Sequence, residues 1–285
     1  MRNEKEIIDL IKNVAANDER IRAVLLNGSR AQPHYITDRF SDFDIMFIVH
    51  AISSFLADHS WIDIFGERLV MQMPDDMTVP CAGKKDDSRF SYLMLFKDYN
   101  RIDLTIFSLD KIDSFKPESL TLVLLDKDGL FNELPAASNA DYLIGKPVQK
   151  EFTDCCNEFW WLCTYVAKGL WRGEITYAKD MMEQPVRTMF FTMLAWYAAI
   201  KHGYPIAPGK SGKYLPTHFD HLYWNNLMAT YPNAEPTEIR AALFLMIELF
   251  RDAAKNVAAH LDFTYNAEED NNVSHYLREV MEMPG

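Results

Sequence analysis

The hydrophobic pattern of the chain changes near residue 150, and this change limits the folds that the chain can adopt. Before that point, short apolar runs alternate with turn sequences and follow one amphipathic helical segment, a pattern typical of a sheet with flanking helices. After that point, apolar residues recur at helical spacing in one segment after another. A chain of 285 residues is long enough for two domains. The sequence therefore predicts a sheet domain followed by a bundle of helices.

The predicted strands of the first domain are short and closely spaced. A helix precedes them, because Ile7, Ile11 and Val14 share one helical face. The turn chemistry of Asp98-Tyr99-Asn100 predicts an antiparallel hairpin between the strands on either side of it. The predicted strands cover residues 23–26, 43–49, 69–73, 90–96, 102–107 and 120–125. The predicted helices of the second domain cover residues 151–172, 175–184, 186–202, 218–230 and 236–261.

Proline, asparagine and glycine interrupt the pattern between the two regions, which indicates a linker over residues 135–150. We therefore expect a sheet domain of residues 1–134 and a helical domain of residues 151–285. The four cysteines are Cys81, Cys155, Cys156 and Cys163. Their spacing matches neither a zinc site nor the set of paired cysteines of a disulfide-rich protein. The first residues do not resemble a secretion signal, and the most apolar stretch, 189–200, is too short to span a bilayer. We expect a cytoplasmic protein that does not bind membranes.

The chain is acidic, with a formal net charge of −12 at pH 7. Acidic residues outnumber basic ones both before residue 150 and from residue 150 onward. Because binding to nucleic-acid phosphates requires clustered lysine and arginine, neither domain is expected to bind nucleic acid. The charge favours a cationic partner, although solubility alone explains it equally well.

Two short motifs place small residues and acids at the ends of predicted strands. Gly28-Ser29 closes the first strand, where backbone N–H groups can hold an anion such as a phosphate. Asp42 and Asp44 lie two residues apart at the start of the next strand, so their side chains emerge on the same face. Neighbouring carboxylates repel each other, and Mg²⁺ would relieve that repulsion while sharing its ligands with substrate phosphates.

A third acid belongs to the same set. In the strand 102–107 the apolar residues Ile102, Leu104 and Ile106 share one face, so Asp103 points to the other. A carboxylate in the middle of a core strand is costly unless it has a partner. Each motif alone is more often structural than functional, but the three motifs in this order are much more specific.

The three motifs together resemble the signature of the nucleotidyltransferase superfamily, in which Gly-Ser is followed by Asp-x-Asp and by a third acid on a later strand. Further segments resemble the streptomycin-modifying aminoglycoside 6-adenylyltransferases, and the match extends into the second domain. These segments are residues 26–30, 65–69, 90–96, 101–105, 124–128 and 158–170. The resemblance implies an α+β fold, with a nucleotidyltransferase-type mixed β-sheet domain and flanking helices before a C-terminal α-helical bundle. It also implies Mg²⁺-dependent transfer of AMP from ATP to a drug hydroxyl, with release of pyrophosphate. This modification of the drug would give antibiotic resistance.

The resemblance also implies roles for individual residues. Asp42 and Asp44 would hold Mg²⁺, and Asp103 would serve the attacking hydroxyl as a base or act as a third metal ligand. The nucleotide phosphates would contact Gly28, Ser29 and Arg30 in the first domain and Lys168 in the second.

A mixed stripe of acidic, aromatic and cationic side chains runs along the predicted helix 151–172 beside its apolar face. It consists of Asp154, Glu158, Trp161, Tyr165, Lys168 and Arg172. The stripe is either a solvated outer surface or the wall of a substrate cleft. On the second interpretation, the candidate drug-binding residues are Glu158 and Trp161 on this helix, with Tyr177 and Asp180 on the next.

Two other functions fit part of the same pattern. A nucleotidyltransferase could act on RNA or on a protein side chain, but the acidic charge of both domains argues against RNA. A catalytically silent nucleotide-binding regulator could keep the fold, but it would have no reason to retain all three acids. We therefore expect a monomeric enzyme whose partners are ATP and a small cationic antibiotic.

Overall fold

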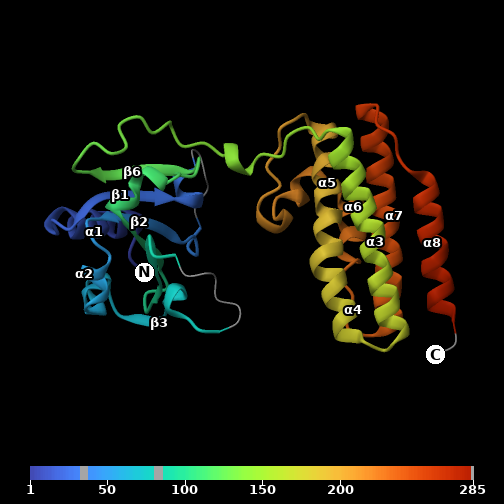
Figure 1. The fold of residues 1–285 in the computed structure, drawn as a ribbon, viewed down its shortest axis with the longest axis horizontal. Helices are drawn as coiled ribbons and strands as arrows, with labels where there is room; N and C mark the ends of the chain where they lie inside the picture. The colour runs from blue at the N-terminus through green and yellow to red at the C-terminus, as the bar shows by residue number, and fades with distance from the viewer. Residues whose placement is uncertain (33–37, 80–85, 284–285) are drawn as a thin grey trace. The chain divides into compact units, whose positions relative to one another are not determined.

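The computed structural model describes residues 1–32, 38–79 and 86–283. The chain divides into two compact units, Met1–Asp141 and Tyr142–Gly285, and the division falls inside the segment 135–150 predicted as a linker (Figure 1). Each unit has a large hydrophobic core of its own.

The first unit is built on a mixed six-stranded sheet with the strand order β3-β4-β5-β2-β1-β6. Strands β2 and β5 pair in parallel, and the other neighbours pair antiparallel. Their bounds are β1 Ile21–Asn27, β2 Phe43–Val49, β3 Arg68–Gln72, β4 Arg89–Phe96, β5 Arg101–Ser108 and β6 Thr121–Asp126. The predicted strands agree with these bounds to within a few residues, and β4 and β5 form the predicted antiparallel hairpin, with Tyr99 at a positive φ of 64° in the turn.

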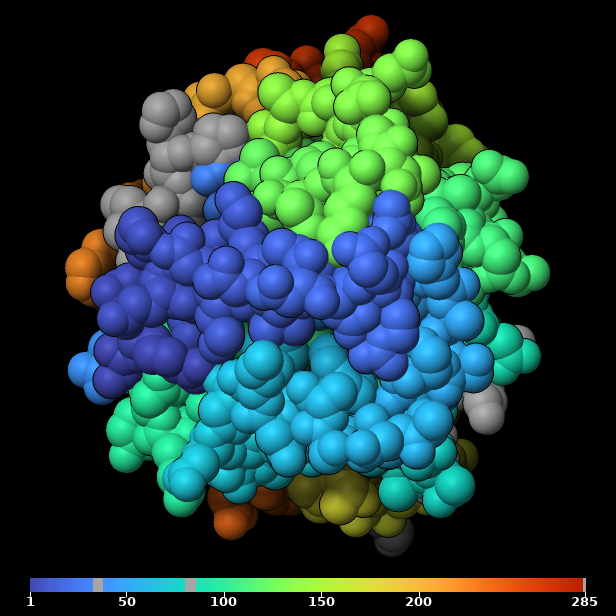
Figure 2. Space-filling view, turned by 90° about the vertical axis from the view of Figure 1, so that its left-hand side faces the viewer, coloured from blue at the N-terminus to red at the C-terminus, as the bar shows by residue number. Residues whose placement is uncertain are grey.

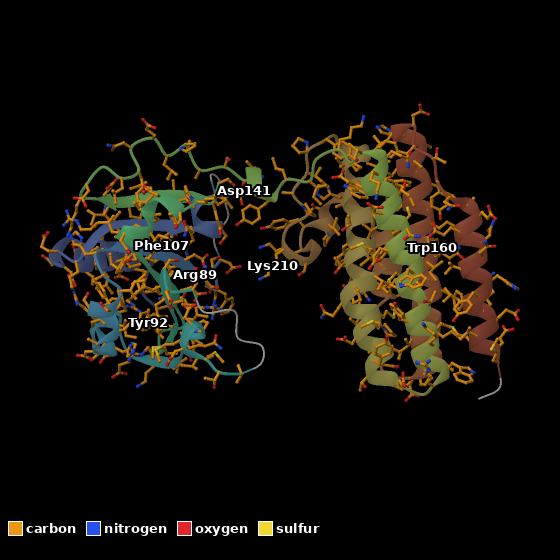
Figure 3. All side chains as sticks on the ribbon, viewed as in Figure 1. Arg89, Tyr92, Phe107, Asp141, Trp160 and Lys210 are labelled. Atoms are coloured by element: carbon orange, nitrogen blue, oxygen red, sulfur yellow. The ribbon has the colours of Figure 1, made fainter. Side chains whose placement is uncertain are left out.

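One face of this sheet is covered by helices and the other is only partly covered. On the covered face, alternate residues of β2 and β5 pack with α1 (Glu4–Asn17) and with the segment that contains α2 (Ser53–Leu56). Tyr92 on β4 belongs to this core and is fully buried (Figure 3). Figure 2 shows the unit from one side, where residues near the N-terminus, in dark blue, lie across the middle of the surface. On the opposite face, a smaller apolar cluster around Ile48 and Phe107 lies toward the ends of β2 and β5.

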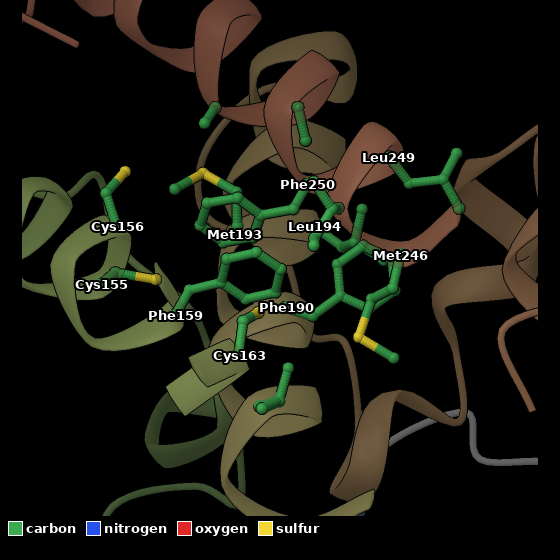
Figure 4. Close-up of a cluster of buried hydrophobic side chains, with 14 of the residues drawn as sticks. Cys155, Cys156, Phe159, Cys163, Phe190, Met193, Leu194, Met246, Leu249 and Phe250 are labelled. Carbon is green, nitrogen blue, oxygen red and sulfur yellow. The ribbon is translucent and has the colours of Figure 1, made fainter. Parts of the chain in front are cut away.

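The second unit consists of helices, as predicted. Their bounds are α3 Gln149–Trp171, α4 Ile175–Met181, α5 Arg187–His202, α6 His221–Met228, α7 Pro236–Leu261 and α8 Ala267–Glu282. A π-helical turn, Met182–Val186, joins α4 to α5 and contains Pro185, which cannot donate a helical hydrogen bond. In the core, the ring of Phe159 on α3 stacks on that of Phe250 on α7 with centroids 3.7 Å apart, and Figure 4 shows sulfur-containing side chains around the pair.

The helix α8 was not predicted from the sequence. Its buried residues are Asp270, Ser274, Leu277 and Val280, so half of its buried face is polar and its apolar periodicity is weak.

Three of the cysteines are buried free thiols on α3, namely Cys155, Cys156 and Cys163. Burial raises the pKa of Cys155 to about 12. Cys81 lies outside the described residues. Among the described helices, none combines the length and the hydropathy that crossing a membrane would require.

Candidate active site

The three predicted acids lie together on the partly covered face of the sheet. Because β2 and β5 pair in parallel, Asp44 lies directly opposite Asp103 in the register. Both side chains point away from the face that carries Phe43 and Ile45, which are buried in the large core. Asp42 immediately precedes β2 and is two residues from Asp44. Parallel pairing thus places two of the carboxylates on adjacent strands, with the third close by along the chain.

Gly28 makes room for the carboxylate of Asp44. It follows β1 with a positive φ of 71°, and a Cβ at this position would overlap Oδ2 of Asp44. A side chain is therefore excluded both by the backbone conformation and by the acid. The N–H of Gly28 donates to the carbonyl oxygen of Leu120 at 3.0 Å, so this donor is committed to the protein. Ser29 follows in the 3₁₀ turn Gly28–Ala31.

Arg30 is bound to the protein, and its predicted contact with the phosphates stays a prediction. Its side chain is 6% exposed, and each of its three nitrogens donates to a protein oxygen. The acceptors are the backbone carbonyls of Ser41 (2.8 Å) and Asp42 (3.0 Å) and the Glu4 carboxylate (2.8 Å). The guanidinium also lies 3.8 Å from the ring centroid of Phe43. In this structure, Arg30 holds the backbone of Asp42 in place.

Arg101 is a site residue that sequence reasoning missed. Its Nε and Nη2 donate to the two oxygens of Asp103, both at 2.7 Å, and its Nη1 lies 3.6 Å from Oδ2 of Asp42. The guanidinium therefore lies between two of the three acids. The spacing held the signal, because residues two apart in a strand share a face and Arg101 precedes Asp103 by two.

The electrostatics of the cluster favour a cation. Burial raises the pKa of Asp44 to about 6, and the nearby carboxylates of Asp103 and Asp42 act in the same direction. Burial also raises the pKa of Asp42, although the Arg101 guanidinium opposes that change. The ionised cluster is thus disfavoured by desolvation and by mutual repulsion, both of which a bound cation would offset.

The residues fit Mg²⁺ bound together with a substrate better than Mg²⁺ bound by protein alone. In residues 1–32, 38–79 and 86–283, no three His, Cys, Asp or Glu side chains are arranged to hold a metal ion. Mg²⁺ commonly takes one or two carboxylates and completes its shell with phosphate oxygens and water. Asp42 and Asp44 supply oxygen donors of this kind, beside the turn that carries Ser29.

In the second unit, the predicted stripe lies on the outer side of α3. Trp161 is 59% exposed, and its Nε1 donates to the hydroxyl of Tyr165 at 2.8 Å. The ammonium of Lys168 lies 4.6 Å from the ring centroid of Tyr165. Trp161, Tyr165 and Lys168 therefore form one connected group.

The other candidates of this unit are also accessible. Glu158 on α3 is exposed, as are Tyr177 and Asp180 on α4. Tyr177 packs beside Gly169, where a Cβ would lie 3.0 Å from its ring. The lack of a side chain at Gly169 lets α4 approach α3 closely at this point.

Comparison with known proteins identifies the family. The model of the streptomycin adenylyltransferase family matches residues 1–280. The chain belongs to this family. Aminoglycoside 6-adenylyltransferases from Campylobacter jejuni and Bacillus subtilis are 42% and 38% identical to it, covering 97% and 98% of this chain and 95% and 98% of their own lengths. Membership in the streptomycin adenylyltransferase family makes this protein a nucleotidyltransferase enzyme and confirms the resemblance noted in the sequence.

A solved structure supports the same conclusion. The crystal structure of an aminoglycoside 6-adenyltransferase from Bacillus subtilis aligns with a TM-score of 0.50 at 34% identity. The alignment covers 99% of this chain and 100% of that one. Together with the mixed sheet and the helical second unit, it confirms the predicted α+β fold.

Proposed function

We propose that this protein is an aminoglycoside 6-adenylyltransferase that transfers AMP from ATP to a hydroxyl of streptomycin and so confers resistance. The observation that carries the proposal is the placement of Asp44 opposite Asp103, with Asp42 beside them and the Gly28–Ala31 turn next to Asp44. The printed names of the relatives support the reaction and the drug class, and the description of the family supports streptomycin.

In the proposed reaction, the drug hydroxyl attacks the α-phosphorus of ATP. A P–O bond to the hydroxyl oxygen forms, the bond between the α-phosphorus and the bridging oxygen breaks, and pyrophosphate leaves. Mg²⁺, when bound with ATP, would neutralise charge on the phosphates. Asp42 and Asp44 would hold it, and Ser29 would contact the phosphates from the turn next to Asp44. Arg30 would position the backbone of Asp42, and its contact with the phosphates stays a prediction.

Asp103 would take the proton of the attacking hydroxyl. It lies on the strand next to Asp44, so an acceptor held on this side of the sheet can reach both the base and the α-phosphate. The two hydrogen bonds from Arg101 hold the Asp103 carboxylate in one orientation. A fixed orientation helps catalysis, because a base must accept the proton of the hydroxyl from a defined position.

Residues of the helical unit are further candidates for substrate contacts. Lys168 would contact the triphosphate, and its place against the ring of Tyr165 limits the directions in which its ammonium can point. The exposed residues Glu158, Trp161, Tyr177 and Asp180 would bind the drug, the two carboxylates by charge and the two aromatic rings by packing and cation–π contact. We further propose a cytoplasmic monomer that binds neither nucleic acid nor membranes.

The test is to incubate the purified protein with ATP, Mg²⁺ and streptomycin and to analyse the drug by mass spectrometry. We expect an adenylyl adduct, formed together with pyrophosphate, and we expect kanamycin to be a poor substrate under the same conditions. Streptomycin that carries a phosphate instead of an adenylyl group, or that stays unmodified, would contradict the proposal.

A further inference from the structure

Arg101 begins β5 on the face that carries Asp103, and its guanidinium lies among the candidate catalytic acids. Its Nε and Nη2 donate to the two oxygens of Asp103, both at 2.7 Å. Its Nη1 lies 3.6 Å from Oδ2 of Asp42, which is close enough for attraction between charges but too long for a hydrogen bond. Two of its nitrogens are thus committed to Asp103, and the third lies near Asp42 without a hydrogen bond to it.

The charge of Arg101 is balanced inside the site, unlike that of the other guanidinium near Asp42. Arg30 donates to the carboxylate of Glu4 at 2.8 Å and reaches Asp42 at its backbone carbonyl. Arg101, in contrast, pairs with the side chains of two of the three acids. The side chain of Arg101 is 43% exposed, so the guanidinium is accessible to a ligand. A change at Arg101 therefore alters the charge of the site directly.

A cation and an anion bound at this site would respond to Arg101 in opposite ways. The guanidinium stays protonated in proteins, so it offsets one negative charge of the acid cluster. Mg²⁺ alone would be repelled by this charge. A triphosphate that binds with Mg²⁺ would be attracted by it, because a guanidinium N–H forms a strong, charge-assisted hydrogen bond to a phosphate oxygen.

We propose that Arg101 makes metal binding depend on the nucleotide. It opposes the binding of Mg²⁺ alone, and it favours Mg²⁺ that binds with a triphosphate, because Nη1 then donates to a phosphate oxygen. This inference rests on the proposed function, and it adds Arg101 to the residues that contact the nucleotide. Arg101 thus has two separable roles, since its charge acts on metal and phosphate while its two parallel hydrogen bonds orient Asp103.

The experiment compares Arg101→Gln with the parent protein and with Arg89→Gln as the matched control. Arg89 is an exposed arginine at the opposite end of the β4–β5 pair, and it pairs with Asp86 at 3.5 Å (Figure 3). Mn²⁺ serves as the probe for metal alone, because it prefers the same oxygen ligands as Mg²⁺ and its free form is measured by electron paramagnetic resonance. Calorimetry measures the binding of a non-hydrolysable ATP analogue at saturating Mg²⁺.

The two affinities should change in opposite directions. Arg101→Gln should strengthen the binding of Mn²⁺ alone by about tenfold, because it removes a positive charge close to a divalent ion. It should weaken the binding of the analogue by about ten- to a hundredfold, because a charge-assisted hydrogen bond is lost. Arg89→Gln should change neither affinity.

Arg101→Lys separates the charge from the hydrogen-bonding geometry. Lysine keeps the positive charge but cannot form two parallel hydrogen bonds to Asp103. The binding of Mn²⁺ alone should therefore stay near that of the parent protein. The kcat with streptomycin should fall by about ten- to a hundredfold, because the Asp103 carboxylate is no longer held in one orientation.

Unchanged or weaker binding of Mn²⁺ to Arg101→Gln would overturn the proposal, and so would unchanged binding of the analogue. Equally strengthened Mn²⁺ binding in Arg101→Lys and Arg101→Gln would overturn it as well, because lysine retains the charge. If the parent protein binds no analogue at any Mg²⁺ concentration, the proposed function fails instead, so the two failures can be told apart. Unchanged thermal unfolding checks that each variant is folded.

Discussion

Within the candidate site, the side chains that touch the acids decide what each acid can do. Asp44 is half-buried, lying against Gly28 and opposite Asp103, whereas Asp103 is held by Arg101. Two carboxylates of the same residue type are therefore in different environments within one site. Different environments separate the roles of paired acids in catalysis, and the first two predictions test this separation.

The first prediction concerns the role of Asp103. Asp103→Asn keeps the shape of the side chain but cannot accept a proton, so turnover should fall by about 10²–10⁴-fold, the usual contribution of a positioned base. Binding of Mg²⁺ with an ATP analogue, measured by calorimetry, should persist. Asp42→Asn serves as the comparison and should damage both. If Asp103→Asn weakens analogue binding as much as Asp42→Asn does, Asp103 is a third metal ligand rather than the base.

The second prediction concerns the raised pKa of Asp44, which is about 6 in the folded protein and near 3.8 otherwise. Folding favours the neutral acid, so its contribution to stability is complete below about pH 4 and is lost as the pH rises through about 6. At pH 7, Asp44→Asn should therefore raise the free energy of unfolding of the metal-free protein by roughly 1–2 kcal/mol, after allowance for solvent screening.

The measurement is urea unfolding at pH 4 and at pH 7. The gap between Asp44→Asn and the parent protein should shrink toward pH 4, because both then carry a neutral side chain. Asp113→Asn, at an exposed carboxylate of the same unit, is the control and should show no such dependence. A gap of the same size at both pH values would contradict the assignment. Since metal binding requires the ionised acid, the affinity for Mg²⁺ should also fall as the pH drops through about 6.

At the scale of single elements, α3 has two different faces. One packs into the helical core through Phe159 and Cys163, and the other carries Trp161, Tyr165 and Lys168. The periodicity of the sequence identified both faces but could not distinguish a solvated surface from a substrate-binding one. A functional test of one residue on the outer face resolves this.

For α3 the third prediction is that Lys168→Ala weakens ATP binding by about ten- to a hundredfold, the value of a charge-assisted contact. Streptomycin binding should change little. Lys150→Ala, on the same helix, is the control, because Lys150 is exposed and pairs along the helix with Asp154. Calorimetry measures both affinities. Equal nucleotide affinities in the two variants would mean that Lys168 belongs to a solvated surface and does not contact ATP.

A buried ion pair links α7 to α8. Arg251 donates to both oxygens of Asp270 at 2.6 Å, and the Asp270 side chain is 3% exposed. Burial alone would raise the pKa of Asp270, but hydrogen bonds from Arg251 and Tyr265 outweigh it and lower the pKa. The polar residues on the buried face of α8 are thus paired rather than solvated.

For α8 the fourth prediction is that Asp270→Ala lowers the free energy of unfolding by about 3 kcal/mol, the lower end for breaking a buried pair, because Arg251 loses its Asp270 partner but keeps its pair with Glu248. Asp154→Ala breaks the exposed pair with Lys150 and should cost at most about 0.5 kcal/mol. Urea unfolding of the two variants makes the comparison. Similar small losses in both would mean that α8 is held by its apolar residues alone.

At the scale of the whole molecule, the net charge of −12 bears on how substrates arrive. Acidic residues exceed basic ones in both units, so a polycationic drug is attracted to the protein as a whole and ATP is not. Salt screens this attraction over about 10 Å at 0.1 M ionic strength.

The fifth prediction is therefore a salt dependence that differs between the two substrates. Raising the ionic strength from about 0.02 to about 0.5 M should increase the KM for streptomycin several-fold, because the Debye length shrinks well below the size of the protein. The KM for ATP should not increase in the same way. Steady-state kinetics at fixed saturating Mg²⁺ provide the comparison, and parallel increases in both KM values would refute a steering role for the charge.

Local sequence patterns predicted a helix or strand well where its apolar residues recur at the spacing of that secondary structure. The bounds of β2 agree with the prediction because Phe43, Ile45 and Phe47 alternate with Asp44 and Met46. The same alternation placed Asp103 on the face opposite Ile102 and Leu104. The helix α8 was missed because its buried face contains a carboxylate and a hydroxyl, which look solvated until Arg251 is known to be their partner.

The sequence by itself determined the periods, faces and motifs of this protein, because these depend on residues that are near one another along the chain. Only the tertiary structure decided which distant residues meet. The parallel pairing of β2 with β5 places Asp44 opposite Asp103, and the fold turns Arg30 toward the carbonyls of Ser41 and Asp42. Strand order and register are set by the packing of the whole sheet, and no local period encodes them.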